Sequence, residues 1–472
     1  MASYNYKELG FKCGLEIHQQ LEGKKLFCNC PAEIKKEKPD FKFIRRLRAS
    51  AGESGKVDQA AAYELEKSKE FEYEAYHDTT CLVEMDEEPP HPVNEEALEA
   101  ALIAAKLLNM KIVDSIQFMR KTVIDGSNVS GFQRTALIGT DGFIEINGKK
   151  IVVDSLCLEE EAAQLVKRGK KKDVYNISRL GIPLLEIATD ASISNPEECK
   201  EAAAHIGMIL RSTGKCKRGI GSIRQDVNIS IEGGARIEIK GFQDIKNIPL
   251  VINNEIDRQL KLIKTKKPVE SAVRKAEPDG TTSYLRPMPG ADRMYPETDI
   301  PVIEPQHIHI KKVETLKEKQ ERYEKQYKLS KDLSLQAVKY ESKENYSFEE
   351  DFKEFKKVEP KFIVDVLLIK APSIIKKENY NFNPLDFKKE LFSGKINYSS
   401  LEYALNEIGK SGKLDLSKFE QISDEEIEKV VKKIIEEHPD TPKGLIMGKS
   451  MQALKGKADG KKVNEIVNKL LG

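Results

Sequence analysis

The alternation of apolar and polar positions over the first 300 residues predicts short β-strands interspersed with a few helices. Phe11–Leu21 alternates over the length of one strand, with Glu16, His18 and Gln20 on one face and apolar residues on the other. Glu16 and His18, two residues apart on one face, could both reach a single cation, but on this segment alone a half-exposed strand with its polar residues facing water is the favoured interpretation.

Helices and hairpins follow along the same region. Helices are predicted at Asn94–Leu108, Asn195–Ser212 and Pro249–Ile263, the first with Asn94 as N-cap and the other two with a proline at their start. Hairpins are predicted where two strand-like runs flank a turn, at Phe143–Ile146 with Ile151–Leu158 and at Ile223–Ile231 with Arg236–Lys240.

The pattern becomes helical, and rich in Lys and Glu, from about Ile310 to the end. Before that point, Lys264–Thr282 is polar and indicates an exposed connection, and Arg293–Pro305 is expected to be extended because its prolines exclude a helix. We therefore expect an α+β chain. A domain with a mixed or antiparallel sheet (1–305) precedes a helical domain (306–412) and a small helical tail domain (413–472).

Composition excludes several classes of protein. In 472 residues, Lys and Arg number 78 and Asp and Glu number 77, so the net charge of +1 indicates no partner and only local asymmetry could. No apolar run is long enough to cross a membrane, and the N-terminus does not resemble a signal peptide. Seven cysteines, an odd number spread thinly, argue against a disulfide scaffold, so a cytoplasmic protein is expected.

Acidic side chains occur where strands are predicted to be buried. Glu159 and Glu160 end an apolar strand, and strand alternation lets only one of them point into a given site. Glu186 lies between apolar neighbours, where an isolated charge is costly and needs a metal or an Arg as partner. Together with Glu16 and His18, these residues are candidates for binding a cation.

The second predicted hairpin carries a dense polar face. Arg224, Asp226 and Asn228 alternate with apolar residues on its first strand, and Lys240 lies on the second. Oxygen ligands suit Mg²⁺ and cations suit phosphoryl oxygens, so this face indicates a site for phosphate and metal. A solvated face would have the same pattern.

Two further features leave alternatives open. Cys28, Cys30 and Cys81 suggest a zinc site that lacks a fourth ligand, for which His77 or His91 are candidates, but free thiols are the favoured interpretation. The stretch 441–472 has seven lysines against two acids, which suits a nucleic-acid contact or simply a solubilising terminus.

A series of motifs resembles a known family. In chain order they are CGLEIHQQL, KLFCNCP, CLVEMDEEPPHPVN, MRKTVIDGSNVSGFQRT, LCLEEEAA, RLGIPLLEI, SIRQDVNISI, ARIEIKG and MYPETDIP, and the final GLIMGKSMQALKGKADGKKVNEIVNKLL resembles a family tail domain. They resemble the GatB/GatE family of glutamyl-tRNA(Gln) amidotransferase subunits, and the archaeal GatE branch in particular.

The resemblance implies a cradle-shaped N-terminal domain, a helical domain and a tail domain that contacts tRNA. It also implies that the chain uses ATP and Mg²⁺ to phosphorylate the γ-carboxylate of glutamate esterified to tRNA(Gln), after which ammonia displaces the phosphate. The ammonia would come from an asparaginase-like partner, GatD, in a D₂E₂ heterotetramer.

The family's metal ligands correspond to His18, Glu159 or Glu160, and Glu186, with Glu16 a candidate for a second ion. Arg224, Asp226, Asn228 and Lys240 are assigned to the same pocket by strand geometry.

In one respect the chain departs from the GatE branch. That branch carries a synthetase-like insertion between the last helix of the cradle and the MYPETDIP segment, where this chain has only about twenty residues between Ile263 and Tyr284. This leaves open how strictly the chain discriminates among tRNAs. A chain that binds tRNA without catalysis, or an amidotransferase with another tRNA or amide donor, remains the alternative.

Overall fold

The computed structural model describes residues 4–47, 55, 69–242, 244–288, 294–310, 313–344, 346–419, 422–439, 441–454, 457–458 and 460–471. The chain divides into two compact units, Met1–Thr315 and Leu316–Gly472. No helix among the described residues is long and apolar enough to cross a membrane. The α+β class expected from the sequence is confirmed, because the sheets lie in the first unit and the second is helical.

The first unit is built on an 11-stranded sheet in the order β14-β13-β12-β11-β1-β10-β7-β6-β5-β15, with β4 paired to β6. Its strands are β1 (Lys12–Gln20), β4 (Lys111–Ile112), β5 (Phe118–Thr122), β6 (Phe132–Ile146), β7 (Lys149–Glu160), β10 (Pro183–Thr189), β11 (Ile223–Ser230), β12 (Ile237–Phe242), β13 (Ala272–Ala276), β14 (Thr282–Pro287) and β15 (Met294–Pro296). The predicted first strand and both predicted hairpins are confirmed. In the turn between β6 and β7, Asn147 and Gly148 both have positive φ, as a type I′ turn requires.

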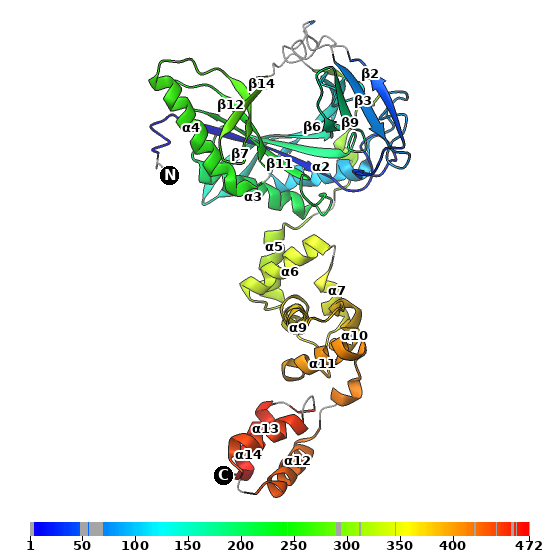
Figure 1. The fold of residues 1–472 in the computed structure, drawn as a ribbon, viewed down its shortest axis with the longest axis vertical. Coiled ribbons are helices and arrows are strands. Elements are labelled where there is room, and N and C mark those ends of the chain that lie inside the picture. Colours follow the sequence, from blue (N-terminus) through cyan, green and yellow to red (C-terminus); the bar gives the residue numbers. More distant parts are fainter. Residues whose placement is uncertain are drawn as a thin grey trace. The chain divides into compact units, whose positions relative to one another are not determined.

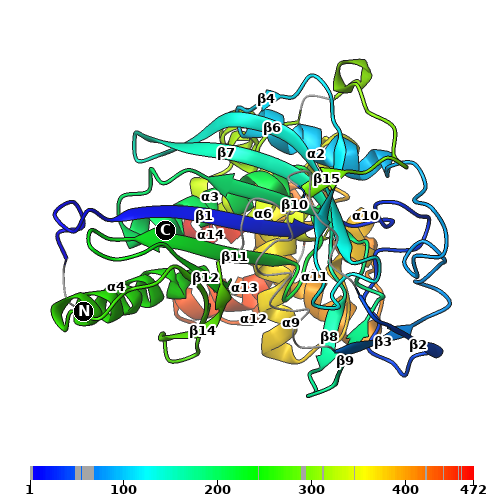
Figure 2. The same cartoon turned by 90° about the horizontal axis from the view of Figure 1, so that it is seen from above.

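Three helices cover one face of this sheet: α2 (Glu95–Leu107), α3 (Pro196–Ser212) and α4 (Ile248–Lys264) (Figures 1 and 2). Asn94 and Asn195 cap the first two, as expected for residues whose side chains accept bonds from backbone N–H groups in the first turn. Cys13, Leu15 and Ile17 of β1 are buried in the core that includes these helices. The alternating residues of β1 therefore face the opposite side of the sheet.

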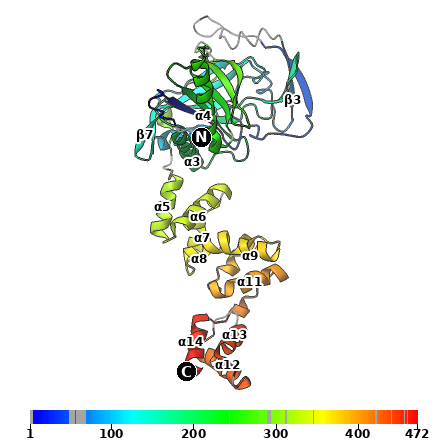
Figure 3. The same ribbon diagram turned by 60° about the vertical axis from the view of Figure 1, so that its left-hand side comes forward.

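A second, four-stranded sheet has the order β2-β3-β9-β8 and was not anticipated from the sequence. Its strands are β2 (Phe41–Arg45), β3 (Glu70–Ala75), β8 (Gln164–Lys167) and β9 (Lys172–Asn176), and Figure 3 shows β3 well apart from β7. Two buried tyrosines join it to the loop after β5, since Tyr73 donates to the carbonyl of Gly126 (2.8 Å) and Tyr175 to that of Asp125 (2.7 Å).

One prediction about the connections was wrong. Lys264–Thr282 is not only a connection, because β13 lies within it and pairs in parallel with β12. Val273 is fully buried there, but charged neighbours hide the strand pattern in the sequence. Met294–Pro296 is extended as expected, whereas Arg293 lies outside the described residues.

The second unit is helical, as expected, with two separate hydrophobic cores. Its helices are α5 (Leu316–Gln326), α6 (Lys331–Glu344), α7 (Phe348–Glu354), α8 (Pro360–Asp365), α9 (Ala371–Glu378), α10 (Lys388–Leu391), α11 (Tyr398–Ser411), α12 (Asp424–Glu437), α13 (Lys443–Ala453) and α14 (Gly460–Leu471). The last three pack against one another around Ile427, Val431 and Val463 (Figure 3).

Gly126 lies in the loop after β5, where its carbonyl accepts a hydrogen bond from Tyr73 of the small sheet. Alanine cannot replace it without strain. It has φ +89°, and a Cβ there would overlap the Phe71 ring. We expect Gly126→Ala to lower the free energy of unfolding by about 2–4 kcal/mol, because overpacking adds to the cost of positive φ. Gly148→Ala is the matched control, since φ is +79° with no atom within 4 Å, and should cost only about 1–2 kcal/mol. Equal losses in denaturant titrations would contradict the packing argument.

Candidate active site

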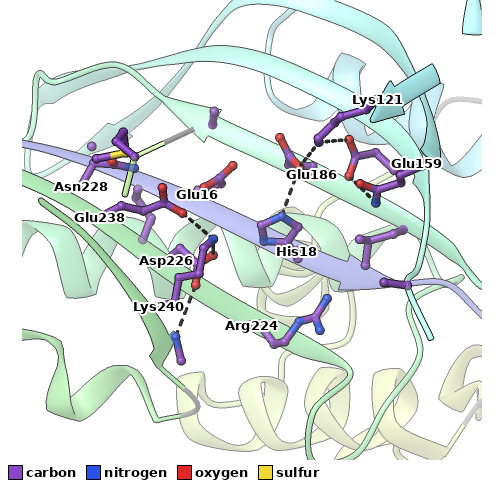
Figure 4. A pocket seen from close by; sticks show the side chains of 18 of the residues that line it. Glu16, His18, Lys121, Glu159, Glu186, Arg224, Asp226, Asn228, Glu238 and Lys240 are labelled. Atoms are coloured by element: carbon purple, nitrogen blue, oxygen red, sulfur yellow. Dashed lines mark hydrogen bonds and ion pairs between the residues drawn. The ribbon is translucent and has the colours of Figure 1, made fainter. Parts of the chain in front are cut away.

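A pocket of about 970 Å³ opens on the face of the main sheet opposite the helices. Five adjacent strands, β7, β10, β1, β11 and β12, contribute its central polar side chains (Figure 4). The structure brings together here eight of the nine predicted site residues: Glu16, His18, Glu159, Glu186, Arg224, Asp226, Asn228 and Lys240.

Strand register explains this convergence. On β1, His18 lies opposite Glu186 of β10, and Glu16 lies opposite Asp226 of β11. Directly opposed residues in antiparallel strands project to the same face with their Cβ atoms roughly 5 Å apart. Groups far apart in sequence therefore meet as a cluster on the pocket floor.

His18 and Glu186 form the closest contact, with His18 Nε2 3.1 Å from Glu186 Oε2. Burial lowers the pKa of His18, but the hydrogen bond to Glu186 and the charges of Glu186 and Glu16 outweigh it and raise the pKa to about 9. Burial and the charge of Glu186 also raise the pKa of Glu16, to about 7. The three ligand atoms lie within 4.8 Å of one another, which suits a shared cation.

Lys121 of β5 balances part of this charge. Its Nζ lies 2.8 Å from Glu159 Oε1 and 3.7 Å from Glu186 Oε2. Burial opposes ionisation of Glu186, but Lys121 and His18 hold the pKa of that carboxyl well below its usual range. Burial and the neighbouring Glu186 charge raise the pKa of Glu159. Glu159 thus faces the pocket as a partner of Lys121 and a neighbour of Glu186.

A second acidic group shares Glu16. Its ligand atoms and those of Asp226 and Glu238 lie within 4.8 Å of one another. Lys240 Nζ lies 2.6 Å from Asp226 Oδ2 and also pairs with Glu238. Burial opposes the charge of Lys240, but these carboxylates raise its pKa above the usual value. This ammonium group already supplies one positive charge beside Glu16.

Arg224 lies further along β11 and is held by Glu161. Its Nη2 donates to Glu161 Oε2 at 2.8 Å and to Oε1 at 3.0 Å, and Gln20 also donates to this carboxylate. Burial opposes ionisation of Glu161, but Arg224 and Arg179 lower its pKa below the usual value. Glu161 therefore holds the Arg224 guanidinium through Nη2. Its Nε and Nη1 have no hydrogen-bond partner among the described residues.

Glu160, the ninth predicted residue, lies outside the pocket. It pairs with Arg134 instead, whose Nη1 lies 3.2 Å from Glu160 Oε1 and whose backbone N–H donates to Oε2 at 3.1 Å. Because alternate residues of β7 face opposite sides, Glu159 is the one of the two that faces the pocket. Asn228 lines the pocket and accepts a bond from Arg236 (3.1 Å).

Sequence reasoning missed Lys121, Glu161 and Arg179 as pocket residues and did not assign a role to Glu238. The alternation that placed Glu159 on one face of β7 also places Glu161 there. Lys121 belongs to a quoted motif, but nothing in its own segment indicates that it contacts Glu159.

Comparison with known proteins agrees with this architecture. A family model described as the GatB/GatE catalytic domain matches residues 11–311, and one described as the GatB domain matches residues 348–471. The chain belongs to the GatB/GatE family. It is 37% identical to the E subunit of the glutamyl-tRNA(Gln) amidotransferase of Methanocaldococcus jannaschii over 99% of each chain. The proteins of the same name from Archaeoglobus fulgidus and Thermococcus gammatolerans are 35% and 34% identical, over 99% of this chain and at least 98% of theirs.

The E-type relatives of this GatB/GatE chain are longer than it is. The alignment with the M. jannaschii protein extends over 632 positions, whereas this chain has 472 residues. Some 160 positions of the alignment therefore have no residue here, which is the size of a domain. This agrees with the missing insertion; its place between Ile263 and Tyr284 stays a prediction.

The three cysteines lie together in the GatB/GatE catalytic domain, and Glu84 completes the group. Ligand atoms of Cys28, Cys30, Cys81 and Glu84 all lie within 4.8 Å of one another. Three thiols and a carboxylate are a donor set that four-coordinate zinc accepts. The proposed fourth ligands lie elsewhere: His91 contacts Glu88, and the His77 ring lies against Phe41. Lys25, fully buried, lies 3.5 Å from Glu84 and adds a positive charge beside it.

We expect the purified chain to bind one zinc ion at this cluster, since three thiols and Glu84 can bind it together. Glu84→Ala should lower zinc content and the free energy of unfolding together. Glu88→Ala, which removes an exposed carboxylate three residues from His91, is the control and should change neither. Full zinc content in Glu84→Ala, measured by elemental analysis, would show that Glu84 is not a ligand.

Proposed function

We propose that this chain converts Glu-tRNA(Gln) to Gln-tRNA(Gln), using ATP, Mg²⁺ and ammonia delivered by the asparaginase-like protein GatD. The observation that carries the proposal is the cluster of Glu16, His18 and Glu186 on the floor of a pocket flanked by Lys and Arg. A carboxylate is a poor electrophile until one of its oxygens becomes part of a phosphate leaving group, so the reaction needs a phosphoryl-transfer site.

The acidic cluster fits a divalent cation. Oxygen ligands from Glu16 and Glu186, with the imidazole of His18, would hold it. Glu159 lies next to Glu186 and forms an ion pair with Lys121. When bound, Mg²⁺ supplies positive charge to the γ-phosphoryl group and to the attacking carboxylate. Binding requires His18 to give up its proton, because only the neutral ring is a ligand.

The cationic side chains have separate tasks in this proposal. Arg224, fixed by Glu161, presents its remaining N–H groups to an anion, and Lys240 adds positive charge beside Asp226. The substrate carboxylate oxygen attacks the γ-phosphorus of ATP and ADP departs. Ammonia then attacks the carbonyl carbon, and phosphate departs as the amide forms. At about 970 Å³, the pocket lies at the upper end of the range of ligand pockets.

The tail domain is proposed to contact the tRNA through its last part, 441–472, which has seven lysines and two acids. A cytoplasmic D₂E₂ assembly, with two copies each of GatD and of this chain, is part of the same proposal. It rests on the E-type relatives, which are named as subunits of the amidotransferase.

The first experiment isolates the chemistry of this chain. We expect the purified chain, given Glu-tRNA(Gln), ATP, Mg²⁺ and ammonium chloride, to form Gln-tRNA(Gln) and to release ADP only with charged tRNA. Free ammonia replaces the partner, so both steps are tested without it. Asp-tRNA(Asn) is the comparison substrate: its amidation would identify a different tRNA preference. If no product forms even with GatD added, the remaining interpretation is a chain that binds tRNA without catalysis.

The metal cluster is tested by replacing its ligands. We expect His18→Ala and Glu186→Ala to lower Gln-tRNA formation at least 100-fold and to weaken Mn²⁺ binding, because each removes a proposed ligand. Binding of tRNA should stay within a few-fold. Glu145→Ala, which removes an exposed carboxylate from β6 of the same sheet, is the control. Normal Mn²⁺ affinity in either pocket variant, by electron paramagnetic resonance, would remove the metal assignment.

A further inference from the structure

The hairpin of β8 and β9 carries a concentrated positive charge at its tip. Five of the six residues from Lys167 to Lys172 are basic, the sixth is Gly169, and all five basic residues are exposed. The whole chain has a net charge of only +1, so this tip is a strong local asymmetry. Such asymmetry, rather than net charge, indicates a polyanionic partner.

Most of the cations at the tip are not neutralised by the protein. Neighbouring basic residues of the same sheet have acidic partners: Lys42 contacts Glu72 and Glu74, and Lys69 lies 2.9 Å from Asp173. Lys172 also pairs with Glu72. By contrast, four tip residues have no ion pair within the part of the chain that the structure describes: Lys167, Arg168, Lys170 and Lys171.

The turn is held in shape by a buried carboxylate. Asp173 accepts a bond from the Gly169 backbone N–H (2.8 Å) and pairs with Lys69. A Cβ on Gly169 would overlap the Lys172 carbonyl oxygen, so the turn is tight. The carboxylate therefore orders the backbone of the turn from which the exposed cations extend.

The base of the hairpin is attached to the catalytic pocket. Arg179, which lines the pocket, follows β9 and donates to the carbonyls of Ala162 (2.7 Å) and Ala163 (2.8 Å), just before β8. Glu161, also a pocket residue, precedes them. Six residues of extended chain from Glu161 to Lys167 span at most about 20 Å. The tip thus lies a short, fixed distance from the pocket.

We propose that this hairpin tip binds the phosphate backbone of the tRNA whose aminoacylated end enters the pocket. The inference rests on the proposed function, which places the end of a nucleic acid there while its phosphates continue outside. Basic side chains that contact phosphates give affinity without sequence information and position the nucleic acid. The hairpin would therefore set the distance between the tRNA body and the reacting ester.

Protection of a sheet edge does not account for so many charges. β8 is the edge strand of the small sheet, and a lysine on an edge discourages pairing with other chains. Lys167 alone meets that need within β8, whereas Arg168, Lys170 and Lys171 lie in the turn beyond it. An acidic protein surface is the other partner of suitable charge, and the test below separates it from tRNA.

The test removes the four unpaired charges together, as Lys167→Ala, Arg168→Ala, Lys170→Ala and Lys171→Ala in the full chain. We expect the Kd for Glu-tRNA(Gln) to rise about tenfold or more near 0.15 M salt, and the slope of log Kd against log salt to fall by about 2–4. The loss should appear in KM for the tRNA more than in kcat. A variant with arginine at Lys167, Lys170 and Lys171 should keep wild-type affinity.

The control variant removes exposed lysines at the opposite end of the first unit. Lys264, Lys266 and Lys267, at the end of α4, are also exposed, and Figures 1 and 2 place α4 far from β9. Their replacement by alanine should leave Kd within twofold. Unchanged tRNA affinity in the hairpin variant, with or without weaker binding of GatD, or an equal loss in the control, would overturn the proposal. Failure of the wild-type chain to form Gln-tRNA even with GatD added would instead refute the proposed function.

Discussion

The register of β1 between β10 and β11 is the constraint on which the candidate site depends. Its apolar residues, Leu15 and Ile17, are fully buried against the helices, and this burial fixes the position of the strand. A slip of one residue would turn Glu16 and His18 into that core and expose the apolar set. The free energy of core packing therefore also holds the ionisable groups in place, so that the site needs no separate device to orient β1.

Once the register is fixed, the buried charges are compensated by side chains on other strands of the sheet rather than by neighbours in sequence. His18 finds Glu186 on β10, Asp226 finds Lys240 on β12, and Glu159 finds Lys121 on β5. Each pair lowers the cost of burying its charges, although desolvation absorbs much of the gain. Glu16 belongs to two acidic groups and has a raised pKa, so a cation beside it would reduce the repulsion among these carboxylates.

Local patterns predicted β1, β11 and β12, because burial on one face leaves a period of two, but they did not reveal β13 or the strands of the small sheet. The same period excluded one of Glu159 and Glu160, but only the pairing of β7 with its neighbours shows that Glu159 faces the pocket. Lys121 could not be assigned, since its partner comes from another strand. Glu84 was not recognised as a fourth ligand for a similar reason. It lies three residues after Cys81 in the sequence, and only the fold brings its carboxylate to Cys28.

The short connection between α4 and β14 completes one side of the main sheet. β13 continues the main sheet there by pairing with β12, and Arg274 on it donates to Thr282 of β14. The strands that carry the pocket residues are thus complete and supported at this edge without the additional 160 or so aligned positions of the relatives. The main sheet of this chain and the pocket on it are therefore formed without those positions. In this chain, the proposed contacts with tRNA outside the pocket would fall to surfaces such as the basic hairpin.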